Sequence, residues 1–165
     1  MRRFHRIRRA LNYVNLSTPL GLLLARIGRA RPCPGPDGLI LAYGYRFRFP
    51  IASAFTVGNV VLTKYEEGFL TGALLRHEDR HASQYMLCLG LPMLPLYLLA
   101  VACSMAICGN QASWNVFERL ANLEDGNYLR RSPWWRRSGP PGPEPPHPES
   151  PHPEPSRQEC PPGAE

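Results

Sequence analysis

The stretch His77-Glu78-Asp79-Arg80-His81 constrains the fold of this chain more than any other. Its two histidines are four residues apart, and on a helix such residues lie one above the other on the same face. Both imidazoles can therefore bind one metal ion, while Glu78 reaches a metal-bound water without ligating the metal. Zinc lowers the pKa of such a water to about 7. The neighbouring carboxylate is then placed to accept its proton as a general base.

The surrounding residues predict that this helix buries its histidines. Leu70, Leu74 and Tyr85 recur at helical spacing with His77 and His81, so the five side chains share one stripe. A buried stripe is where a metal-binding helix needs its ligands. The alternative is a core helix whose histidines donate hydrogen bonds to backbone carbonyls and whose acidic side chain pairs with an arginine.

A third metal ligand is expected on a second helix, predicted from Trp114 to Leu123 with Gly126 placed to end it. Glu118 lies on or beside the apolar face of this helix, where a carboxylate is costly without a partner. A metal ion is one such partner, and Arg80 is the other. We predict Glu118 as the third ligand, with Asp125 as the next candidate. A His-His-Glu set with an open fourth position is the catalytic arrangement of zinc.

Two segments together resemble a known family. Residues 54–62 read A-F-T-V-G-N-V-V-L, and residues 74–84 read L-L-R-H-E-D-R-H-A-S-Q. They are similar to a bacterial zincin-like (gluzincin-type) metallopeptidase domain, often found in proteins linked to extracellular contractile injection systems. The resemblance implies a zincin-like fold, zinc bound by His77 and His81, and peptide-bond hydrolysis with Glu78 as the base. It does not assign Glu118.

The fold class predicted from these segments is α+β. Residues 39–43, 45–49 and 55–62 are rich in β-branched and aromatic side chains and predict three strands of a short antiparallel sheet. The active-site helix and the second ligand-bearing helix follow it. In zincins an edge strand precedes the active helix and holds an extended peptide by strand addition.

Charge and proline content predict three regions. Residues 1–36 form a basic amphipathic segment, because residues 1–31 hold eight arginines and no acid. Residues 37–131 form the metal-binding domain and carry eight acidic and eight basic residues, which argues against a nucleic-acid partner. Residues 132–165 contain 12 of the 19 prolines and predict a disordered tail. The N-terminal segment is expected to pack its apolar side on the core and leave its arginines solvated, with binding to an anionic membrane surface as the alternative.

Residues 87–109 carry no charge, and 23 residues are enough to span a bilayer. A single span would however place His81 and Glu118 on opposite sides of the membrane, so it excludes the predicted metal site. We therefore expect a buried hydrophobic helix, with a membrane-dipping hairpin as the compromise.

Five cysteines without a C-x-x-C pair indicate reduced, buried thiols and a cytoplasmic protein, with membrane association as the alternative. The sequence thus predicts a zinc metallopeptidase that acts on a peptide or protein substrate. Two other hypotheses stay open. One is a catalytically idle zincin-like scaffold or membrane-associated interaction protein, and the other is an integral membrane protein in which the histidine pattern is accidental. The oligomeric state is left open.

Overall fold

The computed structural model describes residues 3–47 and 52–136, and it places helices on both faces of a four-stranded sheet, which confirms the predicted α+β class. The helices are α1 Arg3–Val14, α2 Ser17–Ile27, α3 Gly72–Leu87, α4 Met93–Cys108 and α5 Val116–Leu120. The strands are β1 Arg31–Pro34, β2 Ile40–Tyr43, β3 Ala54–Val57 and β4 Val60–Thr63. Two short 3-10 helices, η1 and η2, cover Pro36–Gly38 and Trp134–Arg136. Of the predicted tail, residues 137–165 lie outside the described part.

The sheet has the strand order β1-β2-β4-β3. Its outer pairs are antiparallel, whereas β2 and β4 run parallel, with Ile40 opposite Val60. The predicted antiparallel sheet is therefore wrong at its central pair. The reason is that the hairpin of β3 and β4 docks on β2 by its second strand, which leaves β3 as the outer strand beside α3.

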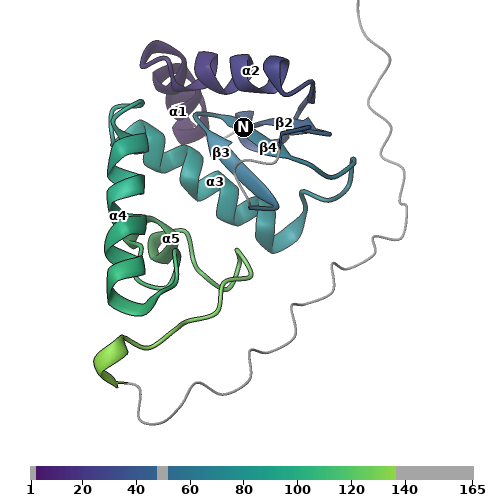
Figure 1. Ribbon diagram of the computed structural model, residues 1–165. Coiled ribbons are helices and arrows are strands. Elements are labelled where there is room, and N and C mark those ends of the chain that lie inside the picture. Colours follow the sequence, from purple (N-terminus) through teal and green to yellow (C-terminus); the bar gives the residue numbers. More distant parts are fainter. Residues whose placement is uncertain (1–2, 48–51, 137–165) are drawn as a thin grey trace, which may run out of the picture.

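The sheet is the middle layer of three (Figure 1). β4 is buried along its whole length, because its alternate side chains enter two different cores. Val60 and Leu62 pack with residues of α2, and Val61 packs on the opposite face with residues of α3. The helix α3, which carries the histidines, is thus held against the sheet by the hydrophobic core that contains Val61.

Residues 55–62, predicted as one strand, fold as most of a hairpin. Gly58 and Asn59 form its two-residue loop, and Gly58 has a φ of +64°, as the first loop position of a type II′ turn requires. A Cβ atom at Gly58 would lie 2.4 Å from the backbone nitrogen of Thr18. Both strands of the hairpin are largely buried, so neither shows the alternation that would have separated them. The strand predicted over 45–49 is not formed in its described residues, 45–47.

The N-terminal helix α1 packs with its polar side inward, contrary to the prediction. Arg8 is 0% exposed, and its guanidinium donates to Asp79 Oδ1 at 2.6 Å and to the Asp37 carbonyl at 3.0 Å. Asn12 is also buried and donates to Asn59 Oδ1 at 3.0 Å. These partners lie 29 to 71 positions away in the chain, so helical periodicity carries no sign of them. The apolar side of α1 faces outward.

The uncharged stretch 87–109 forms a turn and α4, and only part of it is buried. Met93, Ser104 and Cys108 are the buried residues of α4, whereas Leu98 and Leu99 are 62% and 61% exposed. The prediction of a fully buried helix is therefore wrong for the outer face of α4. The prediction of buried thiols holds for Cys108 but not for the exposed Cys103. In the residues that the structure describes, no helix combines the length and the hydropathy needed to cross a bilayer.

Arg8→Ala should lower the free energy of unfolding by about 3 kcal/mol, because it removes the buried partner of an ion pair and leaves the half-buried Asp79 carboxylate without its donor. Urea denaturation of the full chain measures this change. Arg6→Ala, at an exposed position of the same helix, is the control and should cost less than about 0.5 kcal/mol. Equal costs for the two variants would contradict the structural role of Arg8.

Candidate metal centre

The helix α3 presents His77 and His81 on successive turns of its buried face, as its periodicity predicts. Tyr85, on the same stripe, is buried in one hydrophobic core, and Leu70, which precedes the helix, is buried in another. The two imidazole rings are nearly perpendicular, with an interplanar angle of 83°, and their Nε2 atoms lie 3.1 Å apart. Both rings therefore point their Nε2 atoms at one place.

The short helix α5 brings Glu118 to that place. Asn115 is its N-cap residue, and its side-chain oxygen accepts a hydrogen bond from the backbone nitrogen of Phe117 at 3.0 Å. Glu118 follows in the first turn and is buried. Its Oε2 lies 3.1 Å from His77 Nε2, and its Oε1 lies 3.6 Å from His81 Nε2. The three predicted metal ligands thus meet in the structure.

The backbone around α5 determines where His77 carries its proton. The Nδ1 atom of this ring lies 3.1 Å from the carbonyl oxygen of Ala121 and 3.0 Å from that of Asn122. Carbonyl oxygens only accept hydrogen bonds, so Nδ1 is the protonated nitrogen. The Nε2 atom of the neutral ring then has a lone pair, which faces Glu118.

Gln84 determines which ring nitrogen of His81 carries the proton. Its Nε2 donates to the carbonyl oxygen of Phe117 at 2.9 Å, which assigns the orientation of the side-chain amide. Its Oε1 therefore faces His81 Nδ1, at 2.8 Å, and makes Nδ1 the donor. Such outer partners fix the tautomer and the ring orientation of metal-binding histidines.

Three electron-pair donors thus converge in a buried space, and this arrangement fits a metal ion. The candidate ligand atoms of His77, His81 and Glu118 all lie within 4.8 Å of one another. Glu118 Oε2 is buried and has no hydrogen-bond partner. Tetrahedral zinc with bonds of about 2.0–2.1 Å places neighbouring ligand atoms roughly 3.3 Å apart. The observed separations of 3.1, 3.1 and 3.6 Å are close to that value.

The electrostatics of the group are consistent with a site for a cation. Burial alone would raise the pKa of Glu118, but the adjacent His77 and His81 rings stabilise the ionised carboxylate, outweigh the burial and hold this pKa below its ordinary value. Burial alone would lower the pKa of His81, but the hydrogen bond with Glu118 and the charge of Glu78 outweigh it and raise this pKa. A proton on His81 therefore competes with a metal for the same electron pair.

Tyr97 on α4 supports the third ligand. Its hydroxyl donates to Glu118 Oε1 at 2.5 Å. Burial and the nearby Glu118 carboxylate raise the pKa of Tyr97, so the hydroxyl keeps its proton and remains a donor. The apolar stretch predicted to return the chain to the metal thus also supplies a side chain to the site.

Glu78 lies at the wall of the same cavity, beside β3. It is buried, and its Oε2 accepts a hydrogen bond from the hydroxyl of Thr56 at 2.6 Å. Burial raises the pKa of Glu78, although His81 and Thr56 oppose the shift. The cavity has a volume of about 370 Å³. It is lined by Leu24, Ala52, Ala54, Phe55, Thr56, Val57, His77, Glu78, His81, Tyr85, Met93, Leu94, Tyr97, Leu98, Glu118 and Tyr128.

Asp125, the second candidate ligand, does not join the group. Arg80 Nη1 lies 2.5 Å from Asp125 Oδ2, and the hydrogen bond lowers the pKa of Asp125. A guanidinium nitrogen of Arg76 lies 3.5 Å from its other oxygen. Since Arg80 is bound there, it is not the partner of Glu118, and the ion-pair alternative for that carboxylate does not hold.

The roles of Thr56, Tyr97 and Gly126 could not be predicted from helical spacing or composition. Thr56 belongs to the A-F-T pattern of residues 54–56, which is the sequence feature that could have indicated its role. Tyr97 lies in an uninterrupted apolar run and has no such signal. Gly126 was expected to end a helix, yet α5 already ends at Leu120. A Cβ atom at Gly126 would lie 2.7 Å from His77 Cε1, so only glycine lets the backbone approach the ring this closely.

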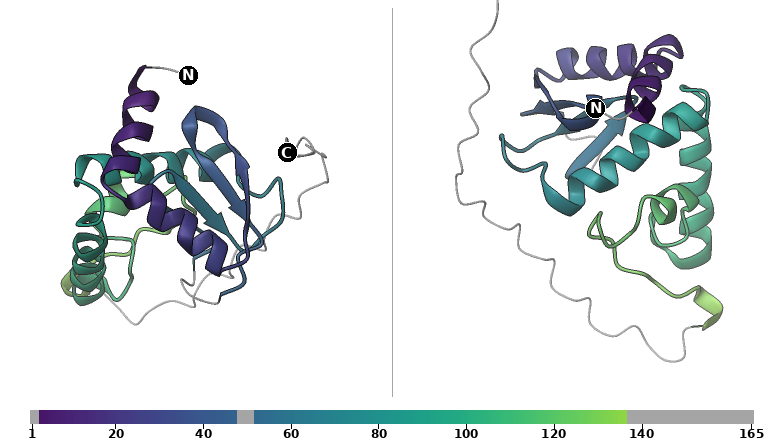
Figure 2. Two further views of the ribbon diagram at one scale, coloured as in Figure 1. Left: turned by 90° about the horizontal axis from the view of Figure 1, so that it is seen from above. Right: turned by 180° about the vertical axis from the view of Figure 1, so that it is seen from behind.

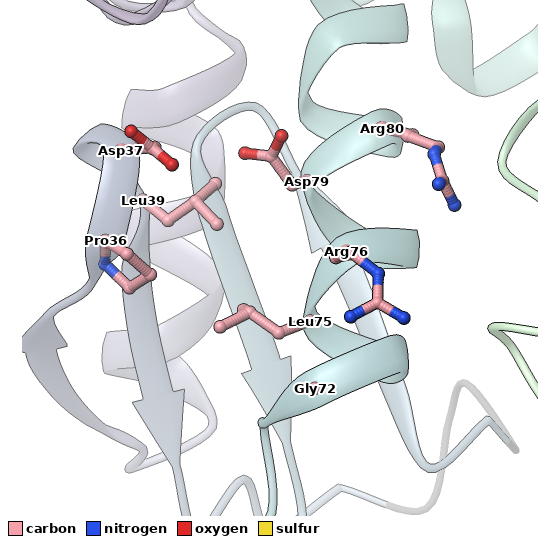
Figure 3. Close-up of a pocket in the computed structure, with 8 residues that line it drawn as sticks. All are labelled: Pro36, Asp37, Leu39, Gly72, Leu75, Arg76, Asp79 and Arg80. Atoms are coloured by element: carbon pink, nitrogen blue, oxygen red, sulfur yellow. The ribbon is translucent and has the colours of Figure 1, made fainter. Parts of the chain in front are cut away.

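A second hollow, of about 330 Å³, lies between α3 and the segment around η1 (Figure 3). Asp79 points across it toward Asp37, whereas Arg80 points away. Asp79 is bound by Arg8, and Arg80 is bound by Asp125. Its charged groups thus already pair within the fold, and the hollow contains none of the three candidate ligands.

Comparisons with protein-family models, with curated proteins and with solved structures found no match for this chain.

Gln84→Met should weaken zinc binding by about 10–100-fold, because His81 loses the acceptor that orients its ring. Competition with a chelator of known affinity measures the change. Gln111→Met is the matched control, since Gln111 is exposed, and it should bind zinc like the unchanged chain. Equal affinity in both variants would mean that Gln84 does not orient the ligand.

Glu118→Ala should weaken zinc binding by more than the roughly 10–100-fold expected for loss of an outer partner, because it removes a ligand itself. Metal analysis of the purified full chain after dialysis measures the retained zinc. Glu124→Ala, at an exposed position of the same region, should retain about one zinc per chain. Full retention by the Glu118 variant would exclude this carboxylate as a ligand.

Proposed function

We propose that this chain is a zinc-dependent metallopeptidase in which His77, His81 and Glu118 hold the ion. The observation that supports this best is the convergence of three buried electron-pair donors. Three protein ligands leave one position open for a water or substrate, whereas structural zinc sites are usually closed by four ligands and rich in cysteine. None of the described cysteines belongs to the group. The resemblance of residues 54–62 and 74–84 to the zincin pattern agrees with the proposal.

In this proposal Glu78 is the general base. When bound, zinc supplies Lewis acidity and brings the pKa of water in its open position to about 7. Glu78 accepts the proton of the attacking water and passes it to the leaving amine. The Thr56 hydroxyl holds one oxygen of this carboxylate in place.

An extended peptide is the substrate that the geometry favours. β3 is one of the two outer strands of the described sheet, and its residues 54–57 line the cavity that contains Glu78. A peptide backbone can pair along such a strand, while its side chains enter pockets. Phe55, Met93 and Leu94 are among the apolar residues of the lining. We therefore expect cleavage next to a large apolar side chain.

Glu78→Gln should retain zinc and abolish hydrolysis, because the amide cannot accept the proton but keeps the shape of the side chain. The measurement is mass spectrometry of a peptide library incubated with the zinc-loaded full chain, together with metal analysis of each variant. Glu124→Gln is the matched control and should cleave like the unchanged chain, since its side chain is exposed.

Two outcomes would contradict this proposal. Equal cleavage by the Glu78 variant and the unchanged chain would exclude Glu78 as the base. Stoichiometric zinc without cleavage of any peptide would instead support the catalytically idle scaffold.

A further inference from the structure

An exposed apolar stripe runs along the length of α1. Burial of Arg8 and Asn12 turns the helix so that its hydrophobic stripe faces away from the domain. The stripe ends at Val14, which is 79% exposed. Its exposed members recur at helical spacing and are Phe4, Ile7, Leu11 and Val14. A helix that buries polar side chains and exposes its apolar stripe indicates that another apolar phase covers the stripe.

The outer face of α4 is apolar as well. No residue from 87 to 109 is charged, and the polar Ser104 points inward, where its hydroxyl donates to the carbonyl of Asn110 at 2.6 Å. Leu96, Leu99 and Met105 are exposed on α4 outside the cavity, whereas the exposed Leu94 and Leu98 lie at its wall. Both helices lie on the same side of the molecule in the views of Figures 1 and 2.

Two turns connect these faces. Gly90, in the turn before α4, packs so closely on Asn15, in the turn after α1, that a Cβ atom there would lie 2.4 Å from Asn15 Cγ. Leu16 and Leu89 are neighbours of this contact in the chain, and both are strongly exposed. The apolar surface therefore runs from α1 across the two turns to α4.

The backbone conformation of these leucines is a second, independent observation. Leu16 has a φ of +66° and Leu89 a φ of +58°. This left-handed region disfavours leucine and favours glycine or asparagine. Neither the backbone nor burial in the domain accounts for leucine at these positions.

The charged residues beside this apolar surface indicate what kind of partner would cover it. Arg3, Arg6 and Arg9 are exposed on α1 between its apolar residues, and no acidic residue occurs in residues 1–31. A second copy of the chain would bring arginines against arginines, which is unfavourable. Anionic lipid headgroups are complementary to such a helix.

The opposite end of α4 carries residues typical of the lipid–water interface. The ring of Trp134 lies against Gly109, which ends α4. Trp134 and Trp135 are both exposed, and Arg136 follows them. Tryptophan is enriched where an apolar phase meets water. At about 24 Å, the 16 residues of α4 are shorter than the roughly 30 Å of a bilayer core.

We propose that α1, the two leucine turns and α4 form a docking surface for an anionic lipid bilayer, on which both helices lie without crossing it. The test is co-sedimentation of the full chain with vesicles. One set contains phosphatidylcholine and phosphatidylserine at about 7:3, and the other contains phosphatidylcholine alone. We expect binding to the first set that weakens with salt, and weaker binding to the second.

The double variant Leu16→Asn, Leu89→Asn should bind the anionic vesicles about tenfold less or weaker still, because two apolar side chains no longer enter the lipid. Asparagine tolerates the positive φ at both positions, so thermal unfolding should occur at the same or a higher temperature. Leu23→Asn, on the exposed face of α2, is the matched control and should leave vesicle binding unchanged.

Three outcomes would overturn the proposal. The first is a folded chain that binds neither vesicle set, and the second is a folded double variant that binds as well as the unchanged chain. The third is a dimer in the absence of lipid, seen by light scattering and lost in the double variant, which would make the surface an interface between copies. None of these readouts measures zinc binding or hydrolysis.

Discussion

The electron-pair donors of His77, His81 and Glu118 converge in a buried space, and several elements of the fold hold them there. His77 and His81 have their Nδ1 protons committed to oxygen acceptors, so in its neutral form each ring turns a lone pair toward the Glu118 carboxylate. Such a group is unfavourable in a buried space unless a cation or a proton lies between its members. The partners that orient it come from several elements: the turn after α5 with its backbone carbonyls, α4 with Tyr97, and α3 with Gln84. The arrangement is therefore a property of the whole fold.

Much of the site could be predicted because its chemistry is tied to local spacing. The histidines follow helical periodicity, and Glu118 is a carboxylate on an apolar face, which needs a partner. What could not be predicted is where the chain bends between these elements. The hairpin of β3 and β4 was missed because its residues are buried on both faces of the sheet and show no alternation. The parallel pairing of β2 with β4 follows from that hairpin and was missed with it.

Helical periodicity also failed to predict which side of α1 is buried. Its apolar stripe predicts the buried side, but Arg8 finds a carboxylate, a hydroxyl and two backbone carbonyls in the interior. A guanidinium with this many acceptors can be buried, whereas one without them cannot. Which side of α1 faces the core thus depends on Asp79, which lies on α3 together with His77 and His81. Likewise, the apolar composition of α4 does not say whether protein or lipid covers its outer face.

The order of the ligands along the chain has a consequence for folding. His81 and Glu118 enclose residues 82 to 117, and all of α4 lies within this loop. An ion bound by both residues closes the loop as a cross-link does, so it reduces the conformational entropy of the unfolded chain. In the folded state it also ties both ends of the loop to one point, although the outer face of α4 gains little from packing in the domain. Binding of an ion at this group would therefore link metal occupancy to the retention of α4 on the domain, and loss of the ion would weaken the attachment of this apolar helix.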